Sequence, residues 1–95
     1  MELNDLLEKV EDEKSFLIFV KALLNERLED IELERKNLSN PFNSSHKGWE
    51  NLSIENFLEA SIAWAEDSNF GKSQNIKENL WYKFAVFLYC GKIYE

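Results

Sequence analysis

Few residues in this chain could act as nucleophiles or general bases. His46 is the only histidine and Cys90 the only cysteine. Ser44 and Ser45 precede His46, but a Ser–His pair needs a third group to orient the imidazole and an oxyanion site, and the neighbouring residues suggest neither. Cys90 lies among aromatic residues without an adjacent base, as is typical of a small buried hydrophobic residue. We therefore predict no catalytic residue and no enzymatic activity.

One segment has the spacing of a metal-binding loop. In DSNFGKSQNIKE, residues 67–78, four oxygen-bearing residues fall where a calcium-binding EF-hand has ligands: Asp67, Asn69, Ser73 and Glu78. The sixth position should be Gly for a sharp turn, but Lys72 stands there and brings a positive charge. Gln74 replaces the usual apolar residue at the eighth position. We interpret the segment as an interhelix linker and predict neither a metal nor a cofactor.

The charge balance limits the choice of partner. Eighteen acidic and eleven basic residues give a net charge of -7. An acidic surface repels phosphates, so nucleic acid and anionic membranes are not expected partners, whereas a basic or neutral protein is. The chain also has no Gly-rich phosphate loop.

Two features indicate a cytoplasmic protein. The first residues, MELNDLLEKVEDE, have neither the basic nor the long apolar segment of a secretion signal, and a single cysteine cannot form an intramolecular disulfide. The longest apolar stretch, LWYKFAVFLYC at 80–90, is far shorter than the ~20 residues of a membrane-spanning helix. Protein rather than lipid should cover it.

The hydrophobic periodicity predicts an all-α fold, a small bundle of three to four helices in one domain, residues 1–95. The expected helices are 3–10, 13–36, 53–67 and 76–90, with a loop at 37–52. Asp12 and Ser53 are suitable N-caps, and Asn75 with Glu78 resembles a capping box. Gly91 follows the last apolar turn, where a left-handed C-terminal cap would place it.

The C-terminal helix should be central, because its surface is apolar nearly all round. A helical projection that places Lys83 towards solvent assigns one arc to the core: Phe87, Leu80, Phe84, Leu88, Trp81 and Ala85. Tyr82 and Tyr89 form a shoulder beside it, and Val86 and Cys90 fall next to Lys83. In 53–67 the residues expected to face inward are Ile54, Phe57, Leu58, Ile62, Trp64 and Ala65.

Four aromatic residues are candidates for partner binding: Trp49, Tyr82, Tyr89 and Tyr94. Tyr and Trp are enriched in interface hot spots, but in a small protein they also pack at the boundary of the core. Both interpretations stay open. Tyr94 belongs to the terminal KIYE segment, which we expect to dock on the core through its large apolar side chains.

The second half of the chain carries motifs of a known family. They are Gly48-Trp49, Phe57-Leu58-Glu59-Ala60, Trp64, Asp67, Trp81, Phe84-Ala85 and the ending Gly91-Lys92-Ile93-Tyr94-Glu95. Over residues 47–95 the chain resembles a family of small bacterial domains of unknown function that begin with Gly-Trp and end with Lys-Ile-Tyr-Glu. The resemblance implies a bacterial origin and carries no activity.

These observations favour a non-catalytic protein-binding module, such as an immunity-type inhibitor or accessory protein with an unidentified, basic partner. The alternative is a structural or self-associating module, a homodimer that buries the surplus apolar surface of 76–90. A third alternative is an enzyme of unknown type that acts through the Trp49 loop and the carboxylates of Glu50 and Glu95.

Overall fold

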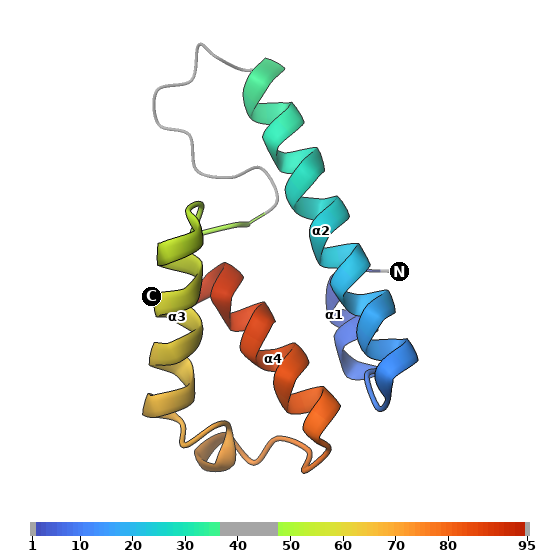
Figure 1. Ribbon diagram of the computed structural model, residues 1–95, viewed down its shortest axis with the longest axis vertical. Helices are drawn as coiled ribbons and strands as arrows, with labels where there is room; N and C mark the ends of the chain where they lie inside the picture. The colour runs from blue at the N-terminus through green and yellow to red at the C-terminus, as the bar shows by residue number, and fades with distance from the viewer. Residues whose placement is uncertain (1, 37–47, 95) are drawn as a thin grey trace.

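The protein is all-helical (Figure 1). A computed structural model describes residues 2–36 and 48–94, and within these ranges it contains helices and no strand. The α-helices are α1 (Leu3–Glu8), α2 (Glu13–Lys36), α3 (Ile54–Asp67) and α4 (Leu80–Ile93), and the short 3₁₀ helix η1 (Lys72–Gln74) lies between α3 and α4. The predicted fold class is confirmed. His46 and most of the predicted loop at 37–52 lie outside the described residues.

Helices α2, α4 and α3 lie side by side in one layer, with α4 in the middle (Figure 1). Helix α1 packs against α2 and α4 on the side that faces away from the viewer. The Cα atoms extend over 44 × 27 × 17 Å, so the molecule is flat. Its radius of gyration is 14.1 Å, whereas a compact chain of this length would have about 12 Å. The C-terminal helix is central, as expected.

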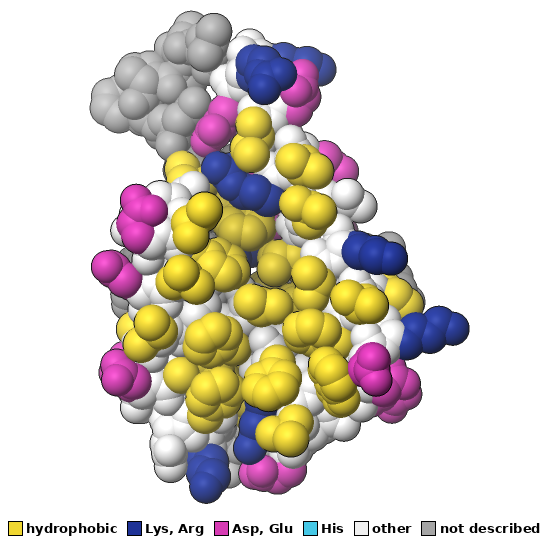
Figure 2. Space-filling model, in the orientation of Figure 1, with side chains coloured by type: hydrophobic (Ala, Val, Ile, Leu, Met, Phe, Trp, Pro, Cys, Tyr) yellow, Lys and Arg dark blue, Asp and Glu magenta, His cyan; other side chains and the backbone are white. Residues whose placement is uncertain are grey.

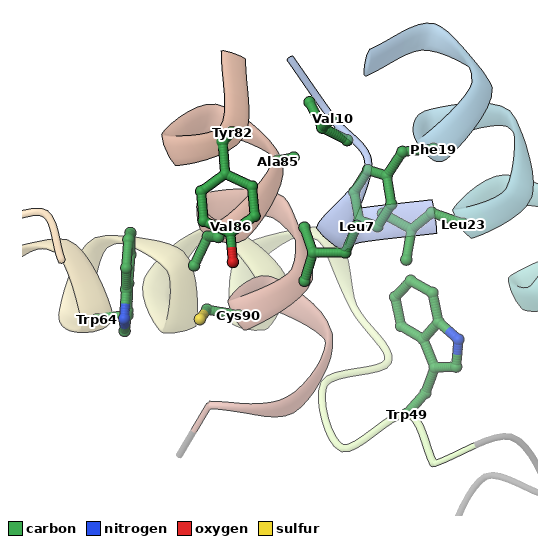
Figure 3. Close-up of a cluster of buried hydrophobic side chains, with 10 residues drawn as sticks. All are labelled: Leu7, Val10, Phe19, Leu23, Trp49, Trp64, Tyr82, Ala85, Val86 and Cys90. Carbon is green, nitrogen blue, oxygen red and sulfur yellow. The ribbon is translucent and has the colours of Figure 1, made fainter. Parts of the chain in front are cut away.

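The core fills the space between α1, α2 and α4 and continues on the α3 side of α4. Leu7, Val10, Phe19 and Leu23 converge on Ala85, and all are buried (Figure 3). Trp64 of α3 lies toward the other side of α4, near Val86 and Cys90. Helix α4 therefore packs on two sides, and within residues 2–36 and 48–94 no helix packs on its third side.

The predicted start of α2 is correct, and the local chemistry explains it. The Ser15 backbone N–H donates to Asp12 Oδ1 at 2.9 Å, and the Asp12 N–H donates to Ser15 Oγ at 3.0 Å. This reciprocal pairing satisfies backbone donors that a helix start leaves free. Ser53 caps α3 in the same way through the Asn56 N–H, as predicted. Helix α1 ends at Glu8 rather than at residue 10, and Lys9 is its C-cap.

The predicted start of the fourth helix at residue 76 is wrong, because the helix begins at Leu80. Asn75 follows η1 and adopts a left-handed conformation with φ 54°. The Ile76 N–H donates to the carbonyl oxygen of Gly71, which precedes η1. The cap is Asn79, whose side chain accepts from the Tyr82 N–H at 3.1 Å. Asn75 and Glu78 form no capping box on α4, and Glu78 instead pairs with Lys83 at 2.9 Å.

The predicted end of this helix at residue 90 is also wrong, since α4 continues to Ile93. Gly91 lies within it and is not a left-handed cap. A Cβ at position 91 would lie 2.6 Å from Ser61 Oγ and 2.7 Å from the Phe57 ring. The close approach of α3 to α4 therefore requires glycine at position 91. The Ser61 hydroxyl stabilises this approach by donating to Phe87 O at 2.8 Å.

Candidate interaction surface

Helix α3 carries a row of apolar side chains that none of the other described helices covers. Ile54, Leu58 and Ile62 recur every four residues, so they form a ridge along one side of the helix. Ile54 is 77% exposed, and the other two are about half exposed. Trp64, Phe57 and Ala65 face the core or its margin as predicted. The prediction that Ile54, Leu58 and Ile62 face inward is wrong.

Helix α4 presents a second ridge, and here the predicted facing is only partly correct. Ala85 is buried and Phe87 and Leu88 pack against the core as predicted. Leu80 is 64% exposed, and Trp81 and Phe84 are also exposed, although all three were assigned to the core. Conversely, the helical projection places Val86 and Cys90 next to Lys83, but both are buried. Lys83 does not mark the solvent side, because its side chain lies largely covered against Glu78.

Helix α2 presents the third ridge. Leu17, Leu24 and Ile31 recur every seven residues, Leu28 lies beside them, and all four are exposed. Spacing of this kind forms the seam by which one helix packs on another. The core-facing residues of α2, such as Phe19 and Leu23, lie on a neighbouring stripe. The seven-residue repeat is the signal in the sequence that could have revealed a second packing surface.

The three ridges belong to one surface, which we call the apolar face. A groove of about 340 Å³ lies between α2 and α3, with Leu24 on one wall, Ile54 on the other and Leu88 of α4 between them. Contacts between aromatic rings join Phe16 of α2 to Trp81 and Trp81 to Phe84. Figure 2 shows hydrophobic side chains across this side of the molecule, over α2, α4 and α3. The apolar face comprises Leu17, Leu24, Leu28, Ile31, Leu52, Ile54, Leu58, Ile62, Leu80, Trp81 and Phe84.

The apolar face is larger than the hydrophobic patches on the surface of an ordinary monomeric protein. Given their exposed fractions, its side chains present on the order of 1,000 Å², against roughly 300–600 Å² for the largest apolar patch of a typical monomer. Stable protein interfaces bury about 800 Å² per partner. The apolar face is therefore large enough to form a complete interface.

A polar cluster fixes the segment that leads into α3. Trp49 is buried, and its indole N–H donates to Glu26 Oε1 at 3.0 Å. The same carboxylate pairs with Lys92, whose side chain is 8% exposed and whose Nζ lies 5.8 Å from the Trp49 ring centroid. The Arg27 guanidinium lies at 5.8 Å from that ring and also pairs with Asp30 at 3.1 Å. Buried charges require such partners, so the cluster holds Trp49 at the base of the groove.

Further hydrogen bonds, from side chains and from the backbone, complete this attachment. The Asn51 side-chain amide donates to Gly91 O at 3.1 Å and to Tyr94 O at 2.9 Å, which satisfies carbonyls at the end of α4. The Glu50 N–H donates to Lys92 O at 2.9 Å. The Tyr94 hydroxyl donates to Asp67 Oδ2 at 2.6 Å, at the end of α3. The Gly-Trp segment and the Lys-Ile-Tyr segment thus lie against each other. The C-terminal segment is docked through residue 94 by these hydrogen bonds and by the packing of Tyr94, whereas Ile93, which was also expected to anchor it, is exposed.

Similarity to a known family covers most of the chain. The model of DUF7660, a family of unknown function, matches residues 12–95. The chain belongs to the DUF7660 family. The match begins further toward the N-terminus than the motifs of residues 47–95, and it includes all of α2 but not α1. Neither the curated proteins nor the solved structures gave a significant match.

In this DUF7660 member two of the four predicted binding residues flank one lysine, because Lys92 Nζ lies 5.8 Å from the ring centroids of both Trp49 and Tyr89. Trp49 and Tyr82 are each 7% exposed, and Tyr82 donates its hydroxyl to Glu8 of α1 at 3.2 Å. Tyr89 and Tyr94 are half-buried. Burial is the main cause that raises the pKa of Tyr82 and Tyr89, whereas the hydrogen bond to Asp67 raises the pKa of Tyr94. Their role in partner binding stays a prediction.

The chemistry of the described residues is limited. Burial raises the pKa of the Cys90 thiol to about 11, so the reactive thiolate is scarce at neutral pH. Across residues 2–36 and 48–94 no group of three or more His, Cys, Asp or Glu side chains is placed to hold a metal ion. Within the same ranges no helix is long and apolar enough to cross a bilayer.

Proposed function

We propose that this DUF7660 member is a non-catalytic protein-binding module and that the apolar face is its binding surface. The observation that carries the proposal is the extent of exposed aliphatic and aromatic side chains on three adjacent helices. Such a surface offers hydrophobic contact and shape but no acid, base or nucleophile. Removing it from water on binding would supply the driving force for association.

The support behind the face favours a preformed surface. Gly91 and Ser61 hold α3 closely against α4, and the Trp49–Glu26–Lys92 cluster links the base of the groove to α2 and α4. A rigid surface loses little conformational entropy when it binds. We therefore expect the partner to meet the face without rearrangement of α2, α3 or α4.

Site-specific photocrosslinking tests this proposal. Benzoylphenylalanine introduced at position 58, on the apolar face, should form a covalent adduct with protein in cells that naturally make this chain. The matched control is position 18, because Ile18 is 49% exposed and Leu58 48%, but Ile18 lies outside the ridge of Leu17 and Leu24. The adduct should be at least several times more abundant from position 58.

Equal labelling from positions 58 and 18, or none from either, would overturn the proposal. Mass spectrometry of the adduct then identifies the bound protein. The same experiment at position 84 provides a second reading, because Phe84 belongs to a different helix of the same face. The proposal requires that the adducts at 58 and 84 contain the same partner.

A further inference from the structure

The apolar face has edges of opposite charge. The edge formed by α3 carries exposed Glu55, Glu59 and Glu66, and α3 contains no Lys or Arg. The edge formed by the first half of α2 carries exposed Lys14 and Lys21, which alternate with Leu17 and Leu24 along the same side of the helix. Figure 2 shows acidic side chains along the α3 edge, whereas the α2 edge shows two basic side chains with acidic ones at its lower end, where α2 begins with Glu13. A partner that matches this face must therefore be positive on one side and negative on the other.

A second copy of the same chain has this property. We propose that the apolar face binds a second copy related by a two-fold axis that runs parallel to the helices in the plane of the face. The inference rests on the proposed function, since it names the partner of the same surface. In this arrangement α3 of each copy lies on α2 of the other, so the contact between an acidic edge and a basic edge occurs twice in the dimer.

The groove between α2 and α3 indicates which residues of the paired helices lie opposite each other. Leu24 and Ile54 line opposite walls of one groove, which α2 lines from Val20 to Arg27, so Ile54 lies within about one turn of the level of Leu24. Rotation about an axis parallel to the helices exchanges the walls and places Ile54 of one copy over Leu24 of the other. Because α2 and α3 run in opposite directions (Figure 1), the paired helices are antiparallel.

Counting along the helices from this pair extends the match. At a rise of ~1.5 Å per residue, Ile62 reaches the level of Leu17. Glu59 falls within one turn of Lys21, and Glu66 within one turn of Lys14. Apolar residues thus meet apolar residues, and Glu59 meets Lys21. Glu66 falls between Lys14 and the exposed Glu13 in the first turn of α2, so the charge match is closest at Glu59 and Lys21.

The alternative two-fold axis, which runs across the helices, gives the opposite result. It would place α3 on α3 and bring the acidic edges together, which is unfavourable for exposed charges at close range. The central helix α4 meets its own copy near the axis in either arrangement. The charge pattern therefore selects the axis parallel to the helices.

Sedimentation equilibrium of the purified chain tests the inference. The wild-type protein should be a dimer at micromolar concentrations, because the face offers about the area that stable interfaces bury. Leu58→Glu should weaken association by about a hundredfold or more, because each of the two copies buries one new charge in the interface. Ile18→Gln, which adds a polar group outside the face without adding charge beside Lys14 and Lys21, should leave it unchanged.

Charge reversal of the edges tests the axis. Glu59→Lys with Glu66→Lys gives a chain with two basic edges, and Lys14→Glu with Lys21→Glu gives a chain with two acidic edges. Each should self-associate about tenfold more weakly than wild type at low salt. The chain with all four changes should regain association, and so should an equimolar mixture of the two variants, as a heterodimer. Circular dichroism confirms that the variants, which alter exposed side chains, are folded.

A wild-type chain that stays monomeric at high micromolar concentrations overturns the inference. If position 58 still crosslinks to a different protein, the proposed function stands and only the second copy is rejected. If that position gives no adduct, both are rejected. A dimer that Leu58→Glu abolishes but that edge reversal does not weaken would overturn the axis parallel to the helices.

Discussion

Each of the three tyrosines has a pKa above its ordinary value of 10.0, but not for one common reason. For Tyr82 and Tyr89 the main cause is burial, which disfavours the charged phenolate, and the carboxylates of Glu8 and Glu26 add to it. For Tyr94 the main cause is the hydrogen bond that its hydroxyl donates to Asp67. Only the protonated phenol can donate this bond, so it holds the proton in place.

These shifts predict that the protein loses stability in alkali. A pKa raised on folding gives stability that is fully present below the unfolded value of about 10. It is lost as pH rises through the folded values. Spectrophotometric titration of tyrosinate should show all three groups ionising at higher pH in the folded chain than in denaturant. Tyr94→Phe should remove one of these transitions and leave the other two. Titration of the folded chain at the ordinary pKa would contradict the described contacts.

The helices themselves were largely predictable, but their facing was not. Asp12 and Ser53 are strong cap residues that precede periodic apolar residues, so the starts of α2 and α3 could be read from sequence. Helix α4 is apolar around almost its whole circumference, so its periodicity could not say which side meets the core. Lys83 is long enough to reach Glu78 from a covered position, and it therefore gave a false solvent direction.

Gly91 provides a test of how closely α3 and α4 approach. In an open helix, Gly→Ala stabilises by about 1 kcal/mol. At position 91 the added methyl group would meet Ser61 and Phe57 at less than 3 Å. We therefore expect Gly91→Ala to destabilise the protein, by roughly 1–3 kcal/mol as for other overpacked sites, as measured by urea unfolding.

The control for this substitution is Ala63→Gly, which lies in α3 at a half-buried position. It measures the intrinsic cost of glycine in a helix of this protein. If Gly91→Ala stabilised the chain by the amount that Ala63→Gly costs, the position would be open and the close approach would be refuted.

The candidate site could not be predicted from the sequence because it depends on which helix surfaces stay exposed after the helices have packed together. Ile54, Leu58 and Ile62 have the spacing of a core-facing ridge, and the sequence alone places them inside. The fold has one layer of three helices backed on one side by a short α1, so the ridges of the other side find no partner within the described chain. Unburied apolar ridges on a flat molecule are a property of its topology, not of any single segment.

Helix α1 packs on the side opposite the apolar face. Removing it should therefore lower the stability of the fold without removing any part of the association surface. Leu7 and Val10 are 6% and 2% exposed, and burying side chains of this kind contributes about 1.5–3 kcal/mol each. A chain that begins at Asp12 would also lose the hydrogen bonds of Glu8 with Lys77 and Tyr82. We expect this chain, which spans the part matched by the DUF7660 model, to unfold at a markedly lower urea concentration than the full chain.

The point variants Leu7→Ala and Val10→Ala should each reproduce part of this loss without changing chain length. If the truncated chain remains folded, it should keep the dimer, because none of the apolar face belongs to residues 1–11. An unchanged urea midpoint would show that α1 does not support the core. A folded but monomeric truncated chain would show that the association surface includes α1, contrary to the dimer proposed above.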